Sequence, residues 1–284
     1  MNVLVFMDFS DMDEIVLKQL VEIGANWNVG EICLTHYIEL QEITDDFSSQ
    51  FPELDKPLEE ILQEELKEKA EAAGLNKDRF TIKIHSKGGK EELMAWVNNS
   101  KYDFCILGKK VIQPGSGVFA AKVARFIDKS ILFTTETSRT RFEKILLTVD
   151  FSGHSKKAVK FLNQLIPHES AEFKLFHAFQ VPSVYFPFVK KYSEKLMLEE
   201  RKKAEKALEH FRKKYTRVAK ENAEVQYVGE SSVDKVIYNY ARTQQIELMV
   251  MGIKGKSDEE DLLIGSVAEK LILSDKQIPV LLVQ

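Results

Sequence analysis

The sequence repeats itself, and this repeat limits what the chain can fold into. Residues 2–23 (NVLVFMDFSDMDEIVLKQLVEI) resemble residues 144–166 (KILLTVDFSGHSKKAVKFLNQLI), with Asp-Phe-Ser at the same place in each. Three further pairs follow in the same order, residues 31–40 with 172–181, 102–110 with 246–254, and 130–135 with 278–283. A nearly constant offset separates the members of each pair, which indicates a duplicated domain.

A polar segment, TETSRTRFEK at residues 135–144, lies between the two copies. A chain of 284 residues is long enough for two domains of ordinary size. We therefore expect one domain at 1–138 and a second at 142–284. In each half strands and helices alternate, and a long charged helix (58–74 and 192–215) follows the second strand.

The strands of the second half, such as 144–149, 248–252 and 280–283, are continuous apolar runs. Such runs are typical of sheets that helices cover on both faces. The predicted fold class is therefore α/β, with an open, doubly wound parallel sheet in each half. Ligands of such sheets bind beyond the carboxyl ends of the strands, which in the second half lie at Asp150, Ala178, Gly229 and Gly252.

Composition and charge argue against several classes of protein. Lys and Arg number 40 against 44 Asp and Glu, with both signs mixed along the chain, whereas a nucleic-acid partner needs a basic face. No run approaches the ~20 apolar residues of a membrane span. The N-terminal MNVLVFMDFS lacks the basic start and the small-residue cleavage site of a signal peptide, so we expect a cytoplasmic protein.

Cysteine and histidine usage predicts neither a disulfide nor a zinc site. Cys33 and Cys105 lie inside apolar runs, which indicates buried, reduced thiols. The six histidines are scattered, whereas a zinc site would need clustered ligands. His154 is predicted to be a surface helix residue, and His177 a packed histidine at a strand end.

The sequence matches neither of two common nucleotide-binding motifs. Gly255-Lys256-Ser257 resembles the end of a P-loop, but that loop needs a glycine where Val250 stands. The dinucleotide motif G-x-G-x-x-G is absent after the first strand of either half, where Asp-Phe-Ser follows.

A wider glycine spacing around the same segment fits a ligand better. Gly252 ends a strand, so a ligand can approach the backbone, and Gly255 allows the loop to turn back. After nine more residues Gly265-Ser266 opens a helix, whose N-terminal N–H groups suit a phosphate. Alternatively, Ser266 caps this helix with Glu269 in a capping box, and the two roles can coexist.

These segments together resemble the universal stress protein family. The resemblance rests on TVDFSGHSKKA, on VGES, and on MG-x-x-G-x9-GS-VAEKL, whose G-2x-G-9x-G-[ST] spacing is similar to that of the family's ATP-binding branch. It covers essentially the whole chain as two tandem domains. It implies a five-stranded parallel sheet in each domain and ATP, or another adenine nucleotide, as the ligand.

The resemblance also implies which residues of the second half bind base and ribose. Asp150 would accept hydrogen bonds from the ribose hydroxyls. The alternative is an aspartate that belongs to a turn or caps the helix. Ala178 would offer its backbone to the adenine edge. Met251 and Gly252 would lie along adenine and ribose.

Four further residues of the second half would serve the phosphates. Gly255 would let the loop close on them, and Gly265, Ser266 and Val267 would bind them through amides and a hydroxyl. An acidic run, residues 258–261, lies between these elements and would repel a triphosphate unless Mg²⁺ bridges the charges or Lys254 and Lys256 offset them. Alternatively, the run is a solvated loop tip that faces away.

The first half keeps Asp8 and Gly108 but departs elsewhere. Val111 replaces the second glycine, and Ala120-Ala121 lies near the Gly-Ser position. Valine adopts a positive φ only with difficulty, so we expect a degenerate site that binds nucleotide weakly or not at all. Within the family, domains pair along the edge formed by the last strand, which implies an intrachain pseudo-dimer. A further homodimer is left open.

The leading hypothesis is therefore a nucleotide-binding stress-response or regulatory protein with one competent site, in the second domain. No residue is predicted to act as a general base or an activated nucleophile, so at most slow, incidental ATP hydrolysis is expected. The alternative is a protein-interaction module with vestigial nucleotide sites. An enzyme of the adenine-nucleotide α-hydrolase type would need a Ser-Gly-Gly-x-Asp-Ser loop after a strand, and no such loop occurs at Asp8 or Asp150.

Overall fold

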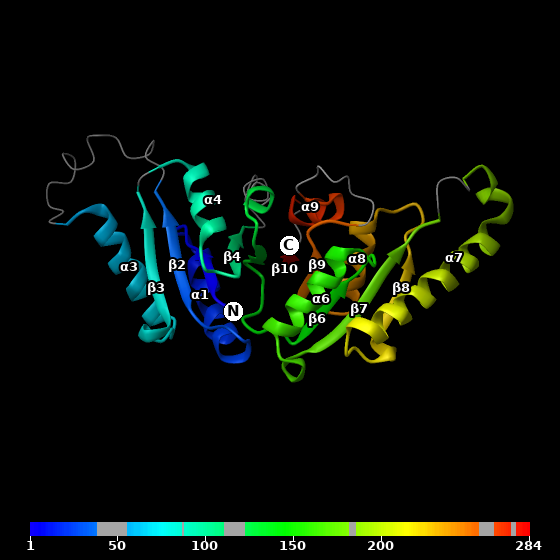
Figure 1. Ribbon diagram of the computed structural model, residues 1–284, viewed down its shortest axis with the longest axis horizontal. Helices are drawn as coiled ribbons and strands as arrows, with labels where there is room; N and C mark the ends of the chain where they lie inside the picture. Colours follow the sequence, from blue (N-terminus) through cyan, green and yellow to red (C-terminus); the bar gives the residue numbers. More distant parts are fainter. Residues whose placement is uncertain (39–55, 87, 111–122, 182–185, 256–263, 274–276) are drawn as a thin grey trace. The chain divides into compact units, whose positions relative to one another are not determined.

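The computed structural model describes residues 1–38, 56–86, 88–110, 123–181, 186–255, 264–273 and 277–284 (Figure 1). The chain divides into two compact units, Met1–Arg141 and Phe142–Gln284. Val111, Pro114, Ala120-Ala121, Lys256, Ser257 and the acidic run 258–261 lie outside the described residues.

The second unit contains a parallel five-stranded sheet. Its strands follow the order β10-β9-β6-β7-β8, with β6 at Lys144–Thr148, β7 at Glu172–Phe179, β8 at Ala223–Tyr227, β9 at Leu248–Gly252 and β10 at Val280–Val283. Because β6 has β9 on one side and β7 on the other, the direction of winding reverses at β6. The carboxyl ends of these three strands therefore border the crevice in which such folds bind ligands.

Two layers of helices cover this sheet. Helix α6 (Gly153–Leu165) and α7 (Phe186–Tyr215) pack against each other, as do α8 (Val233–Thr243) and α9 (Ser266–Leu273). Short 3₁₀ turns at His168–Ser170 and Lys220–Asn222 precede β7 and β8. Coverage on both faces explains the continuous apolar runs, since all four residues of β10 are buried.

The first unit has the same strand order. Its parallel sheet runs β3-β2-β1-β4-β5, with β1 at Val3–Phe6, β2 at Ile32–Tyr37, β3 at Phe80–His85, β4 at Phe104–Lys109 and β5 at Ser130–Thr135. Its described helices are α1 (Met12–Asn26), α3 (Leu58–Ala72) and α4 (Lys90–Asn99), with a 3₁₀ turn at Lys77–Arg79. The predicted α/β class with a parallel sheet is thus confirmed.

The cysteines are buried free thiols, as predicted. Burial raises the pKa of the Cys105 thiol to about 12, so the group stays protonated and unreactive. None of the helices in the described residues is long and apolar enough to cross a membrane.

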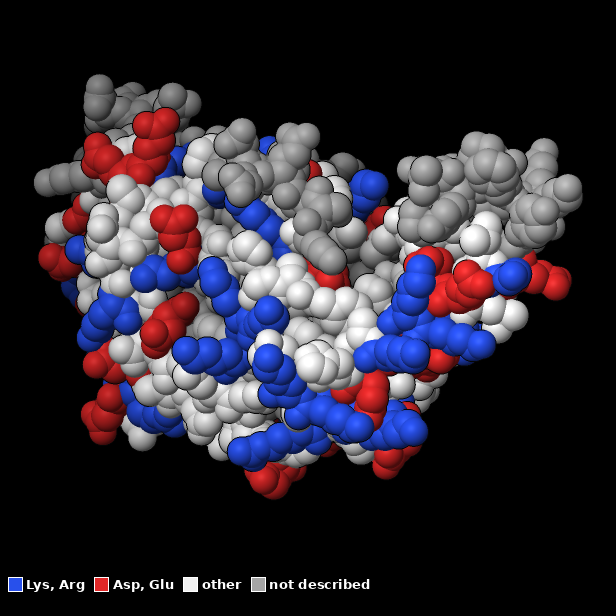
Figure 2. All heavy atoms as spheres, turned by 45° about the vertical axis from the view of Figure 1, so that its right-hand side comes forward, with Lys and Arg blue, Asp and Glu red and all other residues white. Residues whose placement is uncertain are grey.

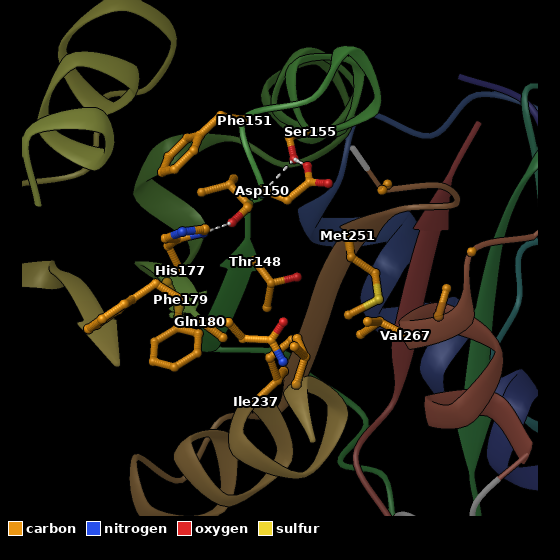
Figure 3. Close-up of a pocket in the computed structure, with 18 of the residues that line it drawn as sticks. Thr148, Asp150, Phe151, Ser155, His177, Phe179, Gln180, Ile237, Met251 and Val267 are labelled. Carbon is orange, nitrogen blue, oxygen red and sulfur yellow. Dashed lines mark hydrogen bonds between the residues drawn. The ribbon is translucent and has the colours of Figure 1, made fainter. Parts of the chain in front are cut away.

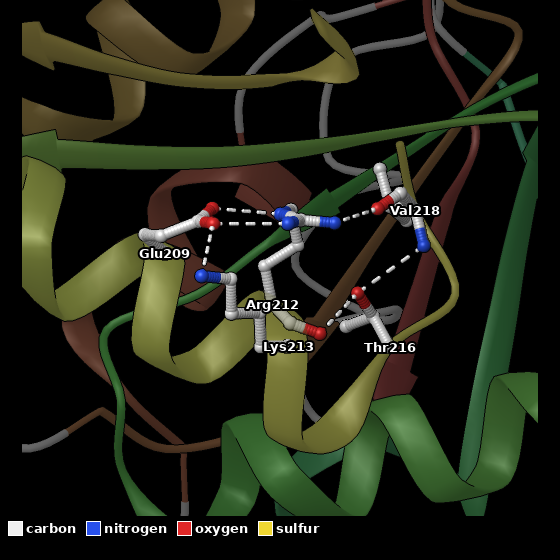
Figure 4. Close-up of polar contacts among 5 residues, drawn as sticks. All are labelled: Glu209, Arg212, Lys213, Thr216 and Val218. Atoms are coloured by element: carbon white, nitrogen blue, oxygen red, sulfur yellow. Dashed lines mark hydrogen bonds and ion pairs between the residues drawn. The ribbon is translucent and has the colours of Figure 1, made fainter. Parts of the chain in front are cut away.

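Helix α7 is longer than expected, because it begins at Phe186 rather than at residue 192. Pro187 stands in its first turn, where a missing N–H costs nothing. Its far end is fixed by Arg212, which donates to Val218 O at 2.8 Å and pairs with Glu209 at 2.8 Å (Figure 4). Hydrogen bonds from Arg212 hold the pKa of Glu209 at about 2.

Basic side chains gather on the exposed side of α6 and α7 (Figure 2). The exposed cations there include Lys156, Lys157 and Lys160 on α6 and Lys213 and Lys214 on α7. Charge is therefore less evenly spread on the surface than along the sequence. Acidic residues of α7 interrupt this surface, since Lys213 itself pairs with Glu209 at 3.2 Å.

Two glycines set the distance between a helix and a strand. A Cβ on Gly252 would lie 2.6 Å from His154 Cβ and 2.9 Å from the His154 carbonyl carbon, so β9 packs directly on the first turn of α6. Gly108 holds β4 against α1 in the same way, with a Cβ 3.2 Å from Met12 Cε. The missing Cβ of Gly252 therefore makes room for the helix, and the expectation that this glycine also leaves room for a ligand stays a prediction.

We predict that Gly252→Ala costs about 3 kcal/mol of folding free energy, because the α6 backbone must move. Gly108→Ala should cost about 1 kcal/mol, since the flexible Met12 side chain can yield. Urea unfolding followed by far-UV circular dichroism measures the loss of stability in Gly252→Ala. Both tryptophans, Trp27 and Trp96, lie in the first unit, so their fluorescence measures the loss of stability in Gly108→Ala.

The matched control is Gly153→Ala, at a position where a Cβ would meet nothing within 4 Å. It should leave stability unchanged or raise it by up to about 1 kcal/mol. Equal losses for Gly252→Ala and Gly153→Ala would contradict the packing role of Gly252.

Candidate functional site

A cavity of about 510 Å³ opens at the carboxyl ends of β6, β7 and β9 in the second unit (Figure 3). Every residue that the sequence proposed for nucleotide binding lines it: Asp150, Ala178, Met251, Gly252, Gly255, Gly265, Ser266 and Val267. These residues come from four separate segments of the chain. Gly229, just beyond the end of β8, is not among the lining residues.

The Asp150-Phe151-Ser152 turn connects β6 to α6 and forms one wall of the cavity. Asp150 Oδ1 accepts hydrogen bonds from Ser152 N at 3.0 Å and from Ser155 Oγ at 2.6 Å. Ser152 Oγ accepts from Ser155 N at 3.1 Å and so caps α6. The turn role that the sequence left open for Asp150 is confirmed, and the same side chain lines the cavity.

Phe151 adopts a left-handed backbone conformation, with φ at +67°, which is costly for a residue with a side chain. Its ring lies 4.4 Å from that of His177 and 5.8 Å from that of Phe211. His177 Nδ1 lies 2.7 Å from Val149 O, and because a carbonyl only accepts, Nδ1 carries the proton. Burial lowers the pKa of His177, so the ring stays neutral and has the packing role that was predicted for it.

The start of α9 is bonded to the end of β9. Gly265 N donates to Ile253 O at 2.8 Å, and Glu269 N donates to Gly265 O at 2.9 Å. The Gly265 amide therefore donates within the protein, and its expected role in phosphate binding stays a prediction. Gly265 also occupies the N-cap position, and Ser266 and Val267 follow in the first turn at the cavity wall.

Sequence reasoning missed the wall that α7 supplies. Ala204 and Ala207 line the cavity from this helix, together with Glu200 and Lys203, which form an ion pair at 2.6 Å. The available signal was the small side chains of the two alanines, spaced three apart and therefore on one face of a helix. Glu200 and Lys203, with Asp150 and Lys254, give the lining two groups of each charge.

The first unit builds the same turn at the end of β1. Phe9 has φ at +58°, its ring lies 4.7 Å from that of His36, and His36 Nδ1 lies 2.8 Å from Met7 O. What differs is the residue after this histidine. Tyr37 stands where the second unit has Ala178, and its hydroxyl donates to Gly88 O at 3.3 Å.

A second difference lies in the first turn of the helix that follows. Asp13 replaces Ser155, and its two carboxylate oxygens accept from Asp8 N at 3.1 Å and from Phe9 N at 2.9 Å. Burial raises the pKa of Asp13 to about 6, and the neighbouring Asp8 carboxylate raises it further. The two N–H donors and Lys69 lower the pKa and so oppose this rise.

The described residues contain no group of three or more His, Cys, Asp or Glu side chains that could hold a metal ion. The acidic run 258–261, where Mg²⁺ was considered, lies outside them.

Comparison with known proteins places this architecture in a family. A family model described as "Universal stress protein family" matches residues 141–284, which is more than half of the chain. The chain therefore belongs to the universal stress protein family. A search of curated proteins found no match.

Two solved structures match over nearly the whole chain. A universal stress protein from Archaeoglobus fulgidus DSM 4304 is 17% identical with a TM-score of 0.63, over 100% of this chain and 96% of that one. A functionally unknown protein from Pseudomonas aeruginosa PAO1 is 16% identical with a TM-score of 0.61, over 99% and 92%. Both likenesses establish the fold, which the first unit thereby shares.

We predict that Asp13 makes the first unit less stable as pH rises. Because the folded pKa of about 6 exceeds the ordinary value of 3.8, ionisation costs folding free energy. This cost is absent below about pH 4 and complete above about pH 6. The difference in stability between Asp13→Asn and the wild type should therefore shift in favour of the variant by up to about 3 kcal/mol from pH 4 to pH 7.

Tryptophan fluorescence during urea unfolding at a series of pH values measures this shift. Asp11→Asn is the matched control, because Asp11 is exposed in the same turn and its side chain makes no capping hydrogen bond. Parallel pH profiles for Asp13→Asn and the wild type would refute the assignment.

Proposed function

We propose that the second unit binds an adenine nucleotide, ATP in the first instance, and that the protein is a nucleotide-binding regulatory protein of stress responses with one competent site. The supporting observation is that all eight motif residues, from four segments, surround one cavity. Its volume of about 510 Å³ falls within the range of ligand pockets. No nucleic-acid or membrane partner belongs to this proposal.

The chemistry of the lining suggests how a nucleotide would lie. Ile237 and Met251 (Figure 3) offer apolar surface for the base, and Ala178 lines the same cavity. Asp150 would accept from the ribose hydroxyls, since a carboxylate oxygen can accept more than one hydrogen bond. The phosphates would meet the first turn of α9, where Ser266 and Val267 lie and where the helix dipole favours negative charge.

The first unit is proposed to lack a competent site. Tyr37 fills with an aromatic ring the position at which Ala178 leaves space. Asp13 adds a second carboxylate beside Asp8, which disfavours a phosphorylated ligand when both are ionised.

The proposal assigns no catalytic residue. Of the carboxylates that line the cavity, Asp150 accepts from Ser152 and Ser155, and Glu200 pairs with Lys203. Neither is placed as a free general base, so we expect ATP hydrolysis to be slow and incidental.

Isothermal titration of the wild type with ATP, ADP and AMP, with and without Mg²⁺, tests the proposal. Ala178→Tyr, which copies Tyr37 of the first unit, should weaken binding at least about ten-fold, because its ring would occupy the base position. The fold should tolerate the change, since the first unit carries the same residue there. Urea unfolding checks this.

Tyr37→Ala is the reciprocal control and should leave the binding constant of the second unit unchanged. An Ala178→Tyr protein that binds as tightly as the wild type would place the site elsewhere. Absence of binding by the wild type would overturn the proposal and favour an interaction module with vestigial sites.

A further inference from the structure

Gln180 is a polar side chain of the cavity that neither the motif nor the proposed function uses. It follows directly on β7, which ends at Phe179, and it lines the cavity. In Figure 3 its amide points into the cavity and lies next to Ile237. Side chains two apart along an extended segment face the same side, which places Gln180 on the side of Ala178.

Other polar side chains near the apolar part of the cavity are already engaged. Thr148 Oγ1 donates to Val250 O at 3.4 Å, and Ser155 Oγ donates to Asp150. Within the residues that the structure describes, the Gln180 amide makes no hydrogen bond. Among the described residues that line the cavity, it is also the one carboxamide. The exposed Gln180 side chain therefore offers a donor and an acceptor beside the surface proposed for the base.

The duplicated half offers a contrast at this position. In the aligned segments EICLTHYIEL and EFKLFHAFQV, Tyr37 stands opposite Ala178 and Glu39 stands opposite Gln180. The structure does not describe Glu39, so the comparison is one of sequence alone. The half that fills the base position with an aromatic ring also lacks the amide.

The two faces of a carboxamide suit adenine and not its 6-oxo relatives. Adenine presents a donor at N6 beside an acceptor at N7, which a glutamine amide meets with two hydrogen bonds. Guanine and hypoxanthine present two acceptors, O6 and N7, so the carbonyl of the glutamine would face another oxygen. Hypoxanthine differs from adenine at position 6 and at N1, which carries a proton, and it has no 2-amino group to add a steric effect.

We propose that the side-chain amide of Gln180 recognises the base at this edge and makes the cavity selective for adenine over 6-oxopurines. The assignment rests on the proposed nucleotide site and adds a specificity-determining residue to it. Ala178 offers the base only backbone groups. Gln180 offers it a side chain, which can be substituted without altering the fold.

Titration calorimetry with the pairs ATP and ITP, and AMP and IMP, tests this assignment. The wild type should bind the adenine member of each pair between about five-fold and about one hundred-fold more tightly. Gln180→Met, which keeps the length of the side chain and removes both hydrogen-bonding groups, should lower the ratio by at least about three-fold, mainly through weaker adenine binding.

Gln226→Met is the matched control. Gln226 is exposed on β8, opposite Ala178 in the strand register, and does not line the cavity. This variant should keep the wild-type ratio. Use of both pairs separates the base from the phosphates, because the same selectivity should appear whatever the length of the phosphate tail.

The outcomes separate this inference from the proposed function. Unchanged selectivity in Gln180→Met, with ATP still bound, would overturn the role of Gln180 and leave the nucleotide site standing. Equal binding of adenine and hypoxanthine nucleotides by the wild type would do the same. Absence of binding of any nucleotide by the wild type would overturn both.

Discussion

The hydrogen bonds that Asp150 Oδ1 accepts from Ser152 N and Ser155 Oγ hold the geometry on which the candidate site depends. They keep Phe151 in a left-handed conformation that its side chain disfavours, so the chain leaves β6 sharply and enters α6 within a few residues. Helix α6 then packs its first turn on Gly252. One short turn therefore fixes the ends of β6 and β9 relative to each other, and with them two walls of the cavity. His177, bonded to Val149 O, connects β7 to the same turn.

The first unit shows which parts of this arrangement serve the fold and which serve a ligand. It repeats the strained phenylalanine, the histidine bonded to the preceding strand and the glycine against the helix, although its motif is incomplete. These features are therefore sufficiently explained by folding. What distinguishes the units is side-chain size and charge around the same turn, a tyrosine in place of Ala178 and a buried aspartate in place of Ser155. The case for a ligand depends on these differences.

Much of the fold could be predicted from the sequence because it depends on local pattern. The continuous apolar runs at 248–252 and 280–283 predicted β9 and β10 with their observed bounds, because strands that are buried on both faces are apolar along their whole length. The rule that ligands bind beyond the carboxyl ends of parallel strands predicted where the eight motif residues would meet, and they line one cavity. Contacts between separate segments could not be predicted from local sequence patterns. The engagement of the Gly265 amide by Ile253 and the wall from α7 depend on how separate segments meet, and no spacing within one segment reports that.

A glycine motif is consequently weaker support for a nucleotide than its specificity suggests. Gly252 is explained by the approach of α6, so it would be needed in a protein of this fold that bound nothing. Residues that the fold does not need carry more information about a ligand. Ala178 and Gln180 are of this kind, because the first unit folds with a tyrosine in the equivalent place and because an amide at a cavity wall does not stabilise the sheet. The proposal of a nucleotide site therefore rests more on the residues proposed to meet the base than on those proposed to meet the phosphates.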